Sequence, residues 1–212
     1  MIFRLDERLL FPNPALAEED GLLAVGGDLS TDRLLLAYRN GIFPWYSEDE
    51  PILWFSPHER FVLYPGELKI SKSMRRVISS GLFNITIDQC FEDVIAACSH
   101  IERPGQDGTW ITADMKTAYI DLNRRGHAHS VEVWHNNNLV GGLYGVQVGN
   151  VFCGESMFSL ASNASKAALI YLCKSGHYQL IDCQVYTPHL ESMGARMISR
   201  AAYMVMLENA GG

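Results

Sequence analysis

The stretch HSVEVWHNNNLVGGLYGVQVGNVFCGESM, residues 129–157, decides the fold. Apolar and polar side chains alternate along three segments of this stretch, which is the period of a half-buried β-strand. The polar run 135–138 and the pair Gly149–Asn150 separate the segments, and turns of this composition join antiparallel neighbours. We therefore expect three consecutive antiparallel strands.

On both sides of this stretch the apolar period changes to that of helices. Ser71 and Thr112 can each cap a helix before it, and a further helix is expected from Phe91 to Cys98. After it, Asn163 opens the helical run ASKAALIYLCKS, LIDCQVY (180–186) reads as another strand, and the last helix carries Tyr203. Helices packed on a mostly antiparallel sheet make an α+β fold.

The first sixty residues differ in character from the rest. They are dense in turn signals and aromatic residues, such as FPNP, GLLAVGGDLS and GIFPWY, with one short helix expected from Ser30 or Thr31 to Tyr38. We interpret residues 1–60 as a small N-terminal domain and residues 61–212 as a larger domain.

Composition places the chain among ordinary globular proteins. Of its 212 residues 48% are hydrophobic and 19% charged, no apolar run approaches the roughly 20 residues of a membrane span, and the stretch MIFRLDERLL lacks the pattern expected of a signal peptide. The five cysteines form no C-x-x-C pair, which suits reduced thiols. We expect a cytoplasmic protein without a metal, because His127 and His129 have no further ligand nearby.

Two carboxylates lie in apolar company. In LIDCQVY, alternation puts Asp182 and Gln184 on one face, so they either bond each other and the backbone or line a cleft. Glu155 follows Phe152 and Cys153 on a strand expected nearby. One buried acid is often structural, but two on neighbouring strands indicate a site that handles an amine or a proton.

Two further clusters have both a structural and a functional interpretation. The run KISKSMRR (69–76) is basic in a chain of net charge −7, and it is either a solvated helix face or a phosphate-binding surface. The negative net charge argues against nucleic-acid coating over the whole surface. The aromatic residues around Trp45, together with Trp110, are either core or a stacking surface for a nucleobase.

Several common active-site motifs are absent. The chain has no G-x-x-x-x-G-K-[ST], H-E-x-x-H or G-x-S-x-G sequence. Gly141, Gly142, Gly145 and Gly149 lie within the strand pattern and do not lead into a helix. They therefore predict bulges or close backbone contact rather than a phosphate cradle.

A set of short motifs runs in order from about residue 10 to residue 198. Together they closely resemble the leucyl/phenylalanyl-tRNA-protein transferase family: GLLAVGGDLS, AYRNGIFPWY, ILWFSPHER, ISKSMRR, GTWIT, GHAHSVEVW, LVGGLYGV, FCGESMFS, NASKAAL, LIDCQV and H-x-x-S-M-G-A. The resemblance implies an enzyme that moves Leu or Phe, and Met less efficiently, from aminoacyl-tRNA to acceptor proteins with N-terminal Arg or Lys, which marks them for degradation. It also implies a larger domain like the acyl-CoA N-acyltransferases, a cytoplasmic location, and no cofactor or metal.

The resemblance also implies roles for individual residues. Asp182 and Gln184 match the catalytic pair, and Glu155 matches the acid near the α-amino group of the aminoacyl moiety. The other matches are Trp45 and Trp110 for the terminal adenosine, Leu143, Phe152, Leu169, Leu172 and Ile181 for the apolar pocket, and Lys72, Arg75 and Arg76 for tRNA phosphates. Some relatives have Met at Leu143 and Asn at Thr187, so the pocket's shape is not carried over.

Two other functions are compatible with parts of the sequence. An acyl-CoA-dependent N-acyltransferase would share the expected fold, although no phosphate-binding turn precedes a helix. A non-catalytic aminoacyl-tRNA-binding module would keep Trp45 and the basic run but would not need Asp182, Gln184 and Glu155 together.

Overall fold

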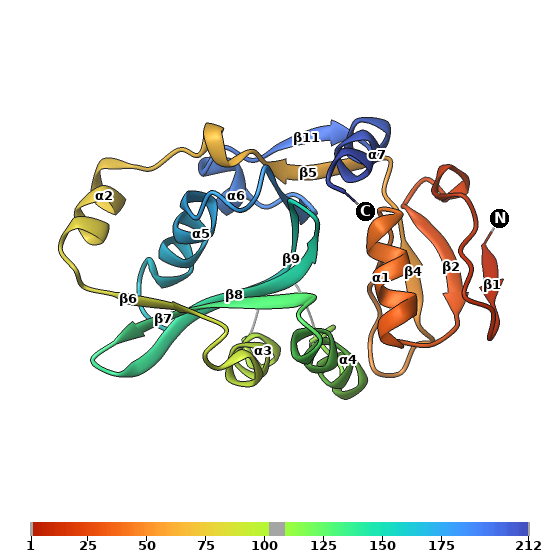
Figure 1. Cartoon of the computed structure of the whole chain (residues 1–212), viewed down its shortest axis with the longest axis horizontal. Helices are drawn as coiled ribbons and strands as arrows, with labels where there is room; N and C mark the ends of the chain where they lie inside the picture. The colour runs from red at the N-terminus through yellow and green to blue at the C-terminus, as the bar shows by residue number, and fades with distance from the viewer. Residues whose placement is uncertain (1, 102–108, 212) are drawn as a thin grey trace.

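A computed structural model of the protein describes residues 2–101 and 109–211 and contains two sheets flanked by helices (Figure 1). Gly108, the first residue of the GTWIT motif, and the terminal Met1 and Gly212 lie outside the described residues. Within the described ranges, no helix is both long and apolar enough to cross a bilayer.

The larger sheet has seven strands in the order β11-β5-β10-β9-β8-β7-β6. Their bounds are β5 Glu59–Leu63, β6 Asn84–Ile87, β7 Ala128–His135, β8 Asn138–Val148, β9 Val151–Ser159, β10 Leu180–Gln184 and β11 Arg196–Ser199. All neighbours are antiparallel except β9 and β10, which are parallel. The predicted run of three antiparallel strands and the α+β class are therefore confirmed.

Helices cover both faces of this sheet (Figure 1). On one face lie α3 Phe91–His100, α4 Ala113–Arg124 and α7 Arg200–Asn209, and on the other α2 Lys72–Ser79, α5 Ala164–Lys174 and α6 Pro188–Ser192. Because side chains alternate along a strand, neighbouring residues pack into the cores on opposite faces of the sheet. Leu180 packs with the first group of helices and Ile181 with the second.

The predicted caps explain where several helices begin. The side-chain oxygens of Ser30, Ser71 and Thr112 each accept a hydrogen bond from a backbone N–H of the first turn of the following helix. Asn163 opens α5 differently: it has a positive φ of 72° and makes no capping bond through its side chain.

The smaller sheet lies in the N-terminal part of the chain and has the order β1-β2-β4-β3. Its elements, with the single helix and the 3-10 turns, are β1 Phe3–Leu5, η1 Pro14–Leu16, β2 Leu22–Gly26, α1 Thr31–Arg39, β3 Phe43–Pro44 and β4 Leu53–Phe55; η2 Pro65–Glu67 follows β5. One continuous core joins this part to α3, α4 and α7. The division at residue 60 stays a prediction, and β5 of the larger sheet begins at Glu59.

The glycines of β8 allow close backbone contact, as the strand pattern predicted. A Cβ at Gly145 would lie 2.2 Å from the carbonyl oxygen of Cys153, and one at Gly141 would lie 2.5 Å from the Cβ of Ala164. The pairing of β8 with β9 also shifts register between Tyr144 and Gly145, which is the expected irregularity.

Candidate functional site

A cavity of about 520 Å³ opens where β10 parts from β9. The two strands pair only as far as Cys153 and Asp182, and the residues that follow on each strand line the cavity. Every residue that the resemblance assigned to catalysis or to the aminoacyl and adenosine pockets borders it: Trp45, Trp110, Leu143, Phe152, Glu155, Leu169, Leu172, Ile181, Asp182 and Gln184.

The apolar wall of the cavity belongs to the α5 face of the sheet. Leu169 and Leu172 come from α5, and they meet residues of β8, β9 and β10 in the same core cluster, namely Leu143, Phe152 and Ile181. All five side chains are at most 4% exposed. The wall is therefore a rigid apolar surface, suited to a hydrophobic side chain.

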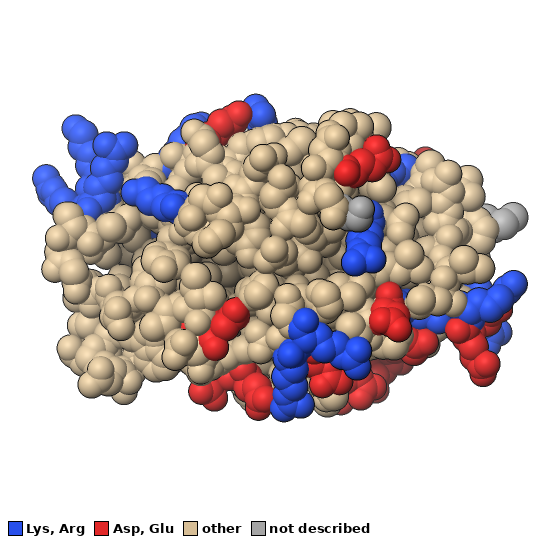
Figure 2. Space-filling view, in the orientation of Figure 1, with Lys and Arg blue, Asp and Glu red and all other residues tan. Residues whose placement is uncertain are grey.

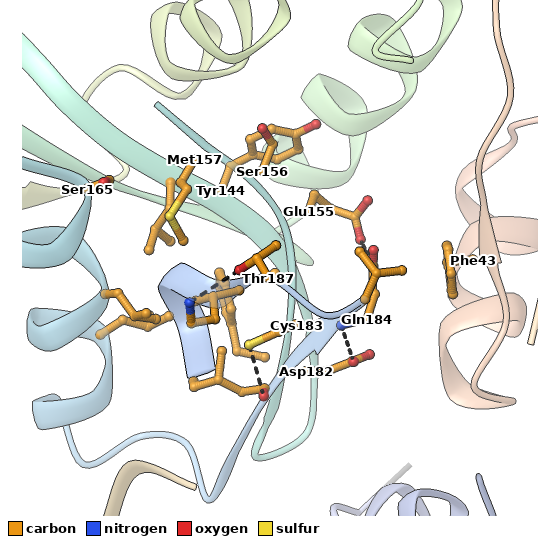
Figure 3. Close-up of a pocket in the computed structure, with 18 of the residues that line it drawn as sticks. Phe43, Tyr144, Glu155, Ser156, Met157, Ser165, Asp182, Cys183, Gln184 and Thr187 are labelled. Carbon is orange, nitrogen blue, oxygen red and sulfur yellow. Dashed lines mark hydrogen bonds between the residues drawn. The ribbon is translucent and has the colours of Figure 1, made fainter. Parts of the chain in front are cut away.

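The polar groups lie beside this wall, as Figure 3 shows. The Gln184 amide nitrogen Nε2 donates a 2.7 Å hydrogen bond to Oε1 of Glu155, which joins β10 to β9 across the gap between them. Both side chains are buried to the same degree, with 8% of each exposed. They form a polar pair at the edge of an otherwise apolar cavity.

Two tyrosines hold the other side of the Glu155 carboxyl. The Tyr38 hydroxyl, from α1, donates to Oε1 over 2.7 Å, and the Tyr119 hydroxyl, from α4, donates to Oε2 over 3.1 Å. The two hydroxyls are themselves 2.5 Å apart. Glu155 is thus fixed by groups from the N-terminal part, from α4 and from β10.

Burial dominates the acid–base properties of this cluster. It raises the pKa of Glu155 to about 7, even though hydrogen bonds from Tyr38, Tyr119 and Gln184 favour the ionised form. Burial, followed by the nearby Glu155 charge, raises the pKa of both tyrosines well above its usual range. Glu155 therefore changes its charge near neutral pH, while the two hydroxyls keep their protons.

Asp182 is held by different partners. Its carboxylate accepts three bonds of 2.8 to 3.1 Å from the guanidinium of Arg60, and a 2.8 Å bond from the Tyr203 hydroxyl. Although Asp182 borders the cavity, none of its side chain is exposed. The carboxylate consequently has no free surface with which to meet an amine directly.

Regular alternation does not continue past Asp182. Asp182 pairs with Val62 of β5 and Gln184 with Phe61, so Cys183 is an extra residue, and Gln184 has a left-handed φ of 62°. The backbone N–H of Gln184 donates a 2.9 Å bond to Oδ1 of Asp182. The sequence left open whether the polar side chains of this strand bond the backbone or line a cleft. The structure shows both: Asp182 bonds the backbone, and Gln184 lines the cleft.

Aromatic residues form the rim. Trp45 is 44% exposed and packs edge-on against Phe55, with ring centroids 5.8 Å apart. Trp110 borders the same cavity, while Trp54 is fully buried in the core. The aromatic residues therefore have two different locations: Trp54 lies in the core, and Trp45 and Trp110 lie at the opening of the cavity.

The predicted basic residues lie apart from the cavity. Lys72, Arg75 and Arg76 are exposed on α2 and do not line the cavity. Figure 2 shows Lys and Arg side chains gathered over α2 at one end of the molecule, whereas the Asp and Glu side chains in this view lie mainly along the lower edge, where further Lys and Arg side chains lie among them. The end of the molecule at α2 is therefore basic in this view, although the net charge of the chain is −7.

No group of three or more His, Cys, Asp or Glu side chains has an arrangement suited to a metal ion in residues 2–101 and 109–211. All five cysteines are free thiols. Cys183 borders the cavity, and burial raises the pKa of its thiol, which makes it a poor nucleophile.

Sequence reasoning missed the residues that orient the site. Tyr38, Arg60, Tyr119 and Tyr203 are all fully or almost fully buried, and each bonds Glu155 or Asp182 from a distant part of the chain. Arg60 offered one clue, since a lone cation precedes the apolar run FVLY. The tyrosines follow the apolar helix pattern and offered none.

Comparisons with known proteins agree with the motif resemblance. A family model described as leucyl/phenylalanyl-tRNA protein transferase matches residues 62–208, and the model of that family's N-terminal domain matches residues 27–58. Proteins named leucyl/phenylalanyl-tRNA–protein transferase are similar over nearly the whole chain. The one from Syntrophobacter fumaroxidans is 59% identical over 209 residues, covering 97% of this chain and 89% of the relative. The one from Flavobacterium johnsoniae is 52% identical over 211 residues, covering 98% and 100%.

Solved structures show weaker likenesses. A conserved protein of unknown function from Bacteroides thetaiotaomicron has a TM-score of 0.43 at 12% identity, covering 63% of this chain and 53% of its own. A GCN5-related N-acetyltransferase from Kribbella flavida has a TM-score of 0.38 at 8% identity, covering 75% and 57%. These TM-scores and identities are too low to support a conclusion about fold or function. The sequence matches show that the chain belongs to the leucyl/phenylalanyl-tRNA protein transferase family, the members of which are aminoacyltransferases.

Proposed function

We propose that the protein transfers Leu or Phe, and Met less efficiently, from aminoacyl-tRNA to the N-terminal Arg or Lys of acceptor proteins. This addition would act in the cytoplasm, in the N-degron pathway of protein degradation. One observation carries the proposal: a single cavity joins an apolar wall to the buried Glu155–Gln184 pair, beside two rim tryptophans.

The donor would bind with its side chain against the apolar wall and its terminal adenosine at Trp45 and Trp110. Stacking of a base on an aromatic side chain contributes about 1 to 3 kcal/mol. The wall accepts linear side chains with weak discrimination, because one methylene is worth only about 1 to 3 kcal/mol. Val and Ile, which branch at Cβ, would be rejected by the width of the pocket at that atom.

The reaction would be aminolysis of the ester that links the amino acid to the tRNA. The acceptor nitrogen forms the new amide bond and loses a proton, the bond to the terminal ribose oxygen breaks, and that oxygen leaves as a hydroxyl after gaining the proton. An α-amino group has a pKa of about 7.7 to 8.0, so a fraction of it is neutral at pH 7. The site must mainly orient this amine and stabilise the oxyanion.

The side chains divide these tasks in our proposal. Glu155 and the Gln184 amide bind the α-amino group of the donor and place its carbonyl, and Gln184 or backbone N–H groups face the oxyanion. Asp182 acts through Gln184, because its carboxylate is enclosed by Arg60 and Tyr203. In one route Asp182, through Gln184, takes charge from the acceptor amine during the attack, and in the other the terminal ribose of the tRNA relays the proton.

The test mixes Leu-tRNA, a peptide that begins with Arg, and the protein, and measures the peptide by mass spectrometry. We expect a gain of one leucyl residue at the N-terminus with an Arg or Lys peptide, and no gain with the same peptide beginning with Glu. Ile-tRNA tests the width of the pocket, and acetyl-CoA replaces the tRNA in a further arm. Transfer regardless of the first residue, equal transfer from Ile-tRNA, or acetyl transfer would contradict the proposal.

A further inference from the structure

We propose that Arg60 is a positioning residue for the transfer reaction, which holds Asp182 and thereby keeps the backbone of Gln184 turned so that its amide faces the cavity. The inference rests on the role proposed above for Gln184. It extends that role to a side chain that does not border the cavity and that comes from β5, two strands away from Glu155.

The first contact of this chain joins Arg60 to Asp182. The guanidinium Nε lies 3.0 and 3.1 Å from the two carboxylate oxygens, and Nη2 lies 2.8 Å from Oδ2. This fork-shaped arrangement fixes the plane of the carboxylate as well as its distance. The orientation of Asp182 therefore depends on the planar group of Arg60.

The second contact passes this orientation to Gln184. Oδ1 of Asp182 accepts the backbone N–H of Gln184 over 2.9 Å, at the bulge where Gln184 has φ 62°. A left-handed conformation is unfavourable for a residue with a Cβ and persists where its surroundings hold it. The Asp182 carboxylate stabilises this left-handed conformation of Gln184, and the Gln184–Glu155 hydrogen bond depends on that conformation.

Arg60 is enclosed on its remaining sides. It is 2% exposed, Nη1 donates a 3.0 Å bond to the carbonyl oxygen of Gly41, and the guanidinium lies 4.7 Å from the ring centres of Phe43 and Tyr203. It cannot reach a substrate in the cavity. Any effect of Arg60 on catalysis must therefore pass through its neighbours.

Lysine cannot replace this arginine in the proposed role. An ammonium group is a point charge without the planar fork that binds both oxygens of a carboxylate. Arg60→Lys keeps the positive charge that balances Asp182, so it separates the loss of geometry from the loss of charge. A misplacement of a reacting group by about 1 Å can cost about 100-fold in rate.

The experiment is a double-mutant cycle on the single-turnover rate, with saturating Leu-tRNA and a peptide that begins with Arg. The four proteins are the wild type, Arg60→Lys, Gln184→Ala and the double variant. We expect Arg60→Lys alone to slow the single-turnover rate by about 10- to 100-fold, with the apparent KM for tRNA unchanged. In the Gln184→Ala background the same change should alter the rate by no more than about twofold.

Arg33→Lys is the matched control. Arg33 is also buried, at 1% exposed, and its Nη2 lies 3.2 Å from a carboxylate oxygen of Asp28, but it does not line the cavity or contact Asp182. This variant should lower the melting temperature and leave the single-turnover rate unchanged in both backgrounds. A similar slowing by Arg33→Lys would show a general effect of destabilisation and overturn the inference.

Tyr203→Phe provides a milder change if Arg60→Lys does not fold. It removes the 2.8 Å bond to Asp182 and the weaker 3.6 Å contact with Sγ of Cys153, and it keeps the ring beside Arg60. We expect a smaller loss of rate that also disappears in the Gln184→Ala background. An unchanged rate, or a loss that adds fully to that of Gln184→Ala, would refute the role of the buried network. If Gln184→Ala itself reacts at the wild-type rate, the proposed role of Gln184 fails instead.

Discussion

When Glu155 is ionised, the ring that it forms with two tyrosine hydroxyls has more hydrogen-bond contacts than hydroxyl protons. Three contacts join its carboxyl, the Tyr38 hydroxyl and the Tyr119 hydroxyl in a ring. Two hydroxyl protons can fill only two of them, and protonation of Glu155 supplies the third. The ring therefore offers the neutral acid one more hydrogen bond, and burial raises the pKa of the same group to about 7.

This raised pKa predicts how the stability of the protein changes with pH. The ordinary pKa of the group is 4.5, so the folded state holds the proton of Glu155 more tightly than the unfolded state does. The resulting stabilisation is fully present below pH 4.5 and is lost as pH rises to about 7. The shift corresponds to about 3 kcal/mol. Urea unfolding of the wild type and of Glu155→Gln at several pH values should show this loss in the wild type alone. Parallel curves would show that Glu155 does not titrate with folding.

Gly145 has no room for a side chain. A Cβ there would lie 2.2 Å from the Cys153 carbonyl oxygen and 2.6 Å from the ring of Phe152, which forms part of the apolar wall. Gly145→Ala should destabilise the protein by about 1 to 3 kcal/mol or more through overpacking. Gly66→Ala is the control, since nothing lies within 4 Å of its added Cβ. Chemical denaturation measures both variants, and equal stability of the two would contradict the expected clash.

Strand β10 shows how far the sequence could predict the candidate site. Alternation in LIDCQVY identified the strand and drew attention to Asp182 and Gln184, because polar residues stand out in an apolar run. It could not predict the extra residue Cys183 or the left-handed Gln184, since both depend on the partner strand β5. Arg60 lies 122 residues from Asp182 in the sequence, so no local pattern could join them.

The helices were predicted best where a cap and a stop were both local. Ser71 and Thr112 cap α2 and α4 as predicted, and the glycines just beyond the two helices, Gly81 and Gly126, both have a positive φ. The short strand β11 and helix α6 were missed, because their few residues show no clear period. Length and local chemistry, rather than importance for the fold, decided which elements the sequence could predict.

The exposed cations of helix α2 can be tested for contact with tRNA. If its exposed cations bind tRNA phosphates, reversing Arg75 and Arg76 to Glu should raise the apparent KM for Leu-tRNA and lower the salt dependence of binding by a slope of about two. A leucyl-adenosine donor, which lacks the phosphates of the tRNA, should react as before. Steady-state kinetics with both donors, over a range of salt concentrations, make the comparison.

The matched control reverses Arg124 and Arg125, which are also adjacent, exposed arginines at the end of a helix. The change in net charge is the same, and the exposed ion pair of Arg124 with Glu92 contributes only about 0 to 1 kcal/mol. We expect a clearly smaller effect on tRNA binding. Equal effects of the two pairs would mean that net charge alone matters, and equal loss with both donors would remove α2 from tRNA binding.

For the whole molecule, the site depends on contacts between the N-terminal part and the larger sheet. Tyr38 bonds Glu155, and the carbonyl of Gly41 binds Arg60, so both carboxyl groups of the site are held from α1 and the residues after it. The hydrophobic core is continuous across the same boundary, from Leu23 and Trp54 to Tyr119. The two parts that match separate family models are thus joined by one core and one polar network.

This continuity predicts that the chain unfolds as a single cooperative unit, because separating the parts would expose a shared core and leave Glu155 and Arg60 with unpaired polar groups. Four tryptophans allow a test: Trp45 and Trp54 report on the N-terminal part, and Trp110 and Trp134 on the rest. With Trp110 and Trp134 replaced by Phe, fluorescence follows the N-terminal part alone, while far-ultraviolet circular dichroism follows mainly the larger sheet and its helices. We expect the two urea transitions of this variant to coincide in midpoint and slope. A fluorescence transition at lower urea, with the circular dichroism unchanged, would show that the N-terminal part opens first, and the site could then not rely on it for its geometry.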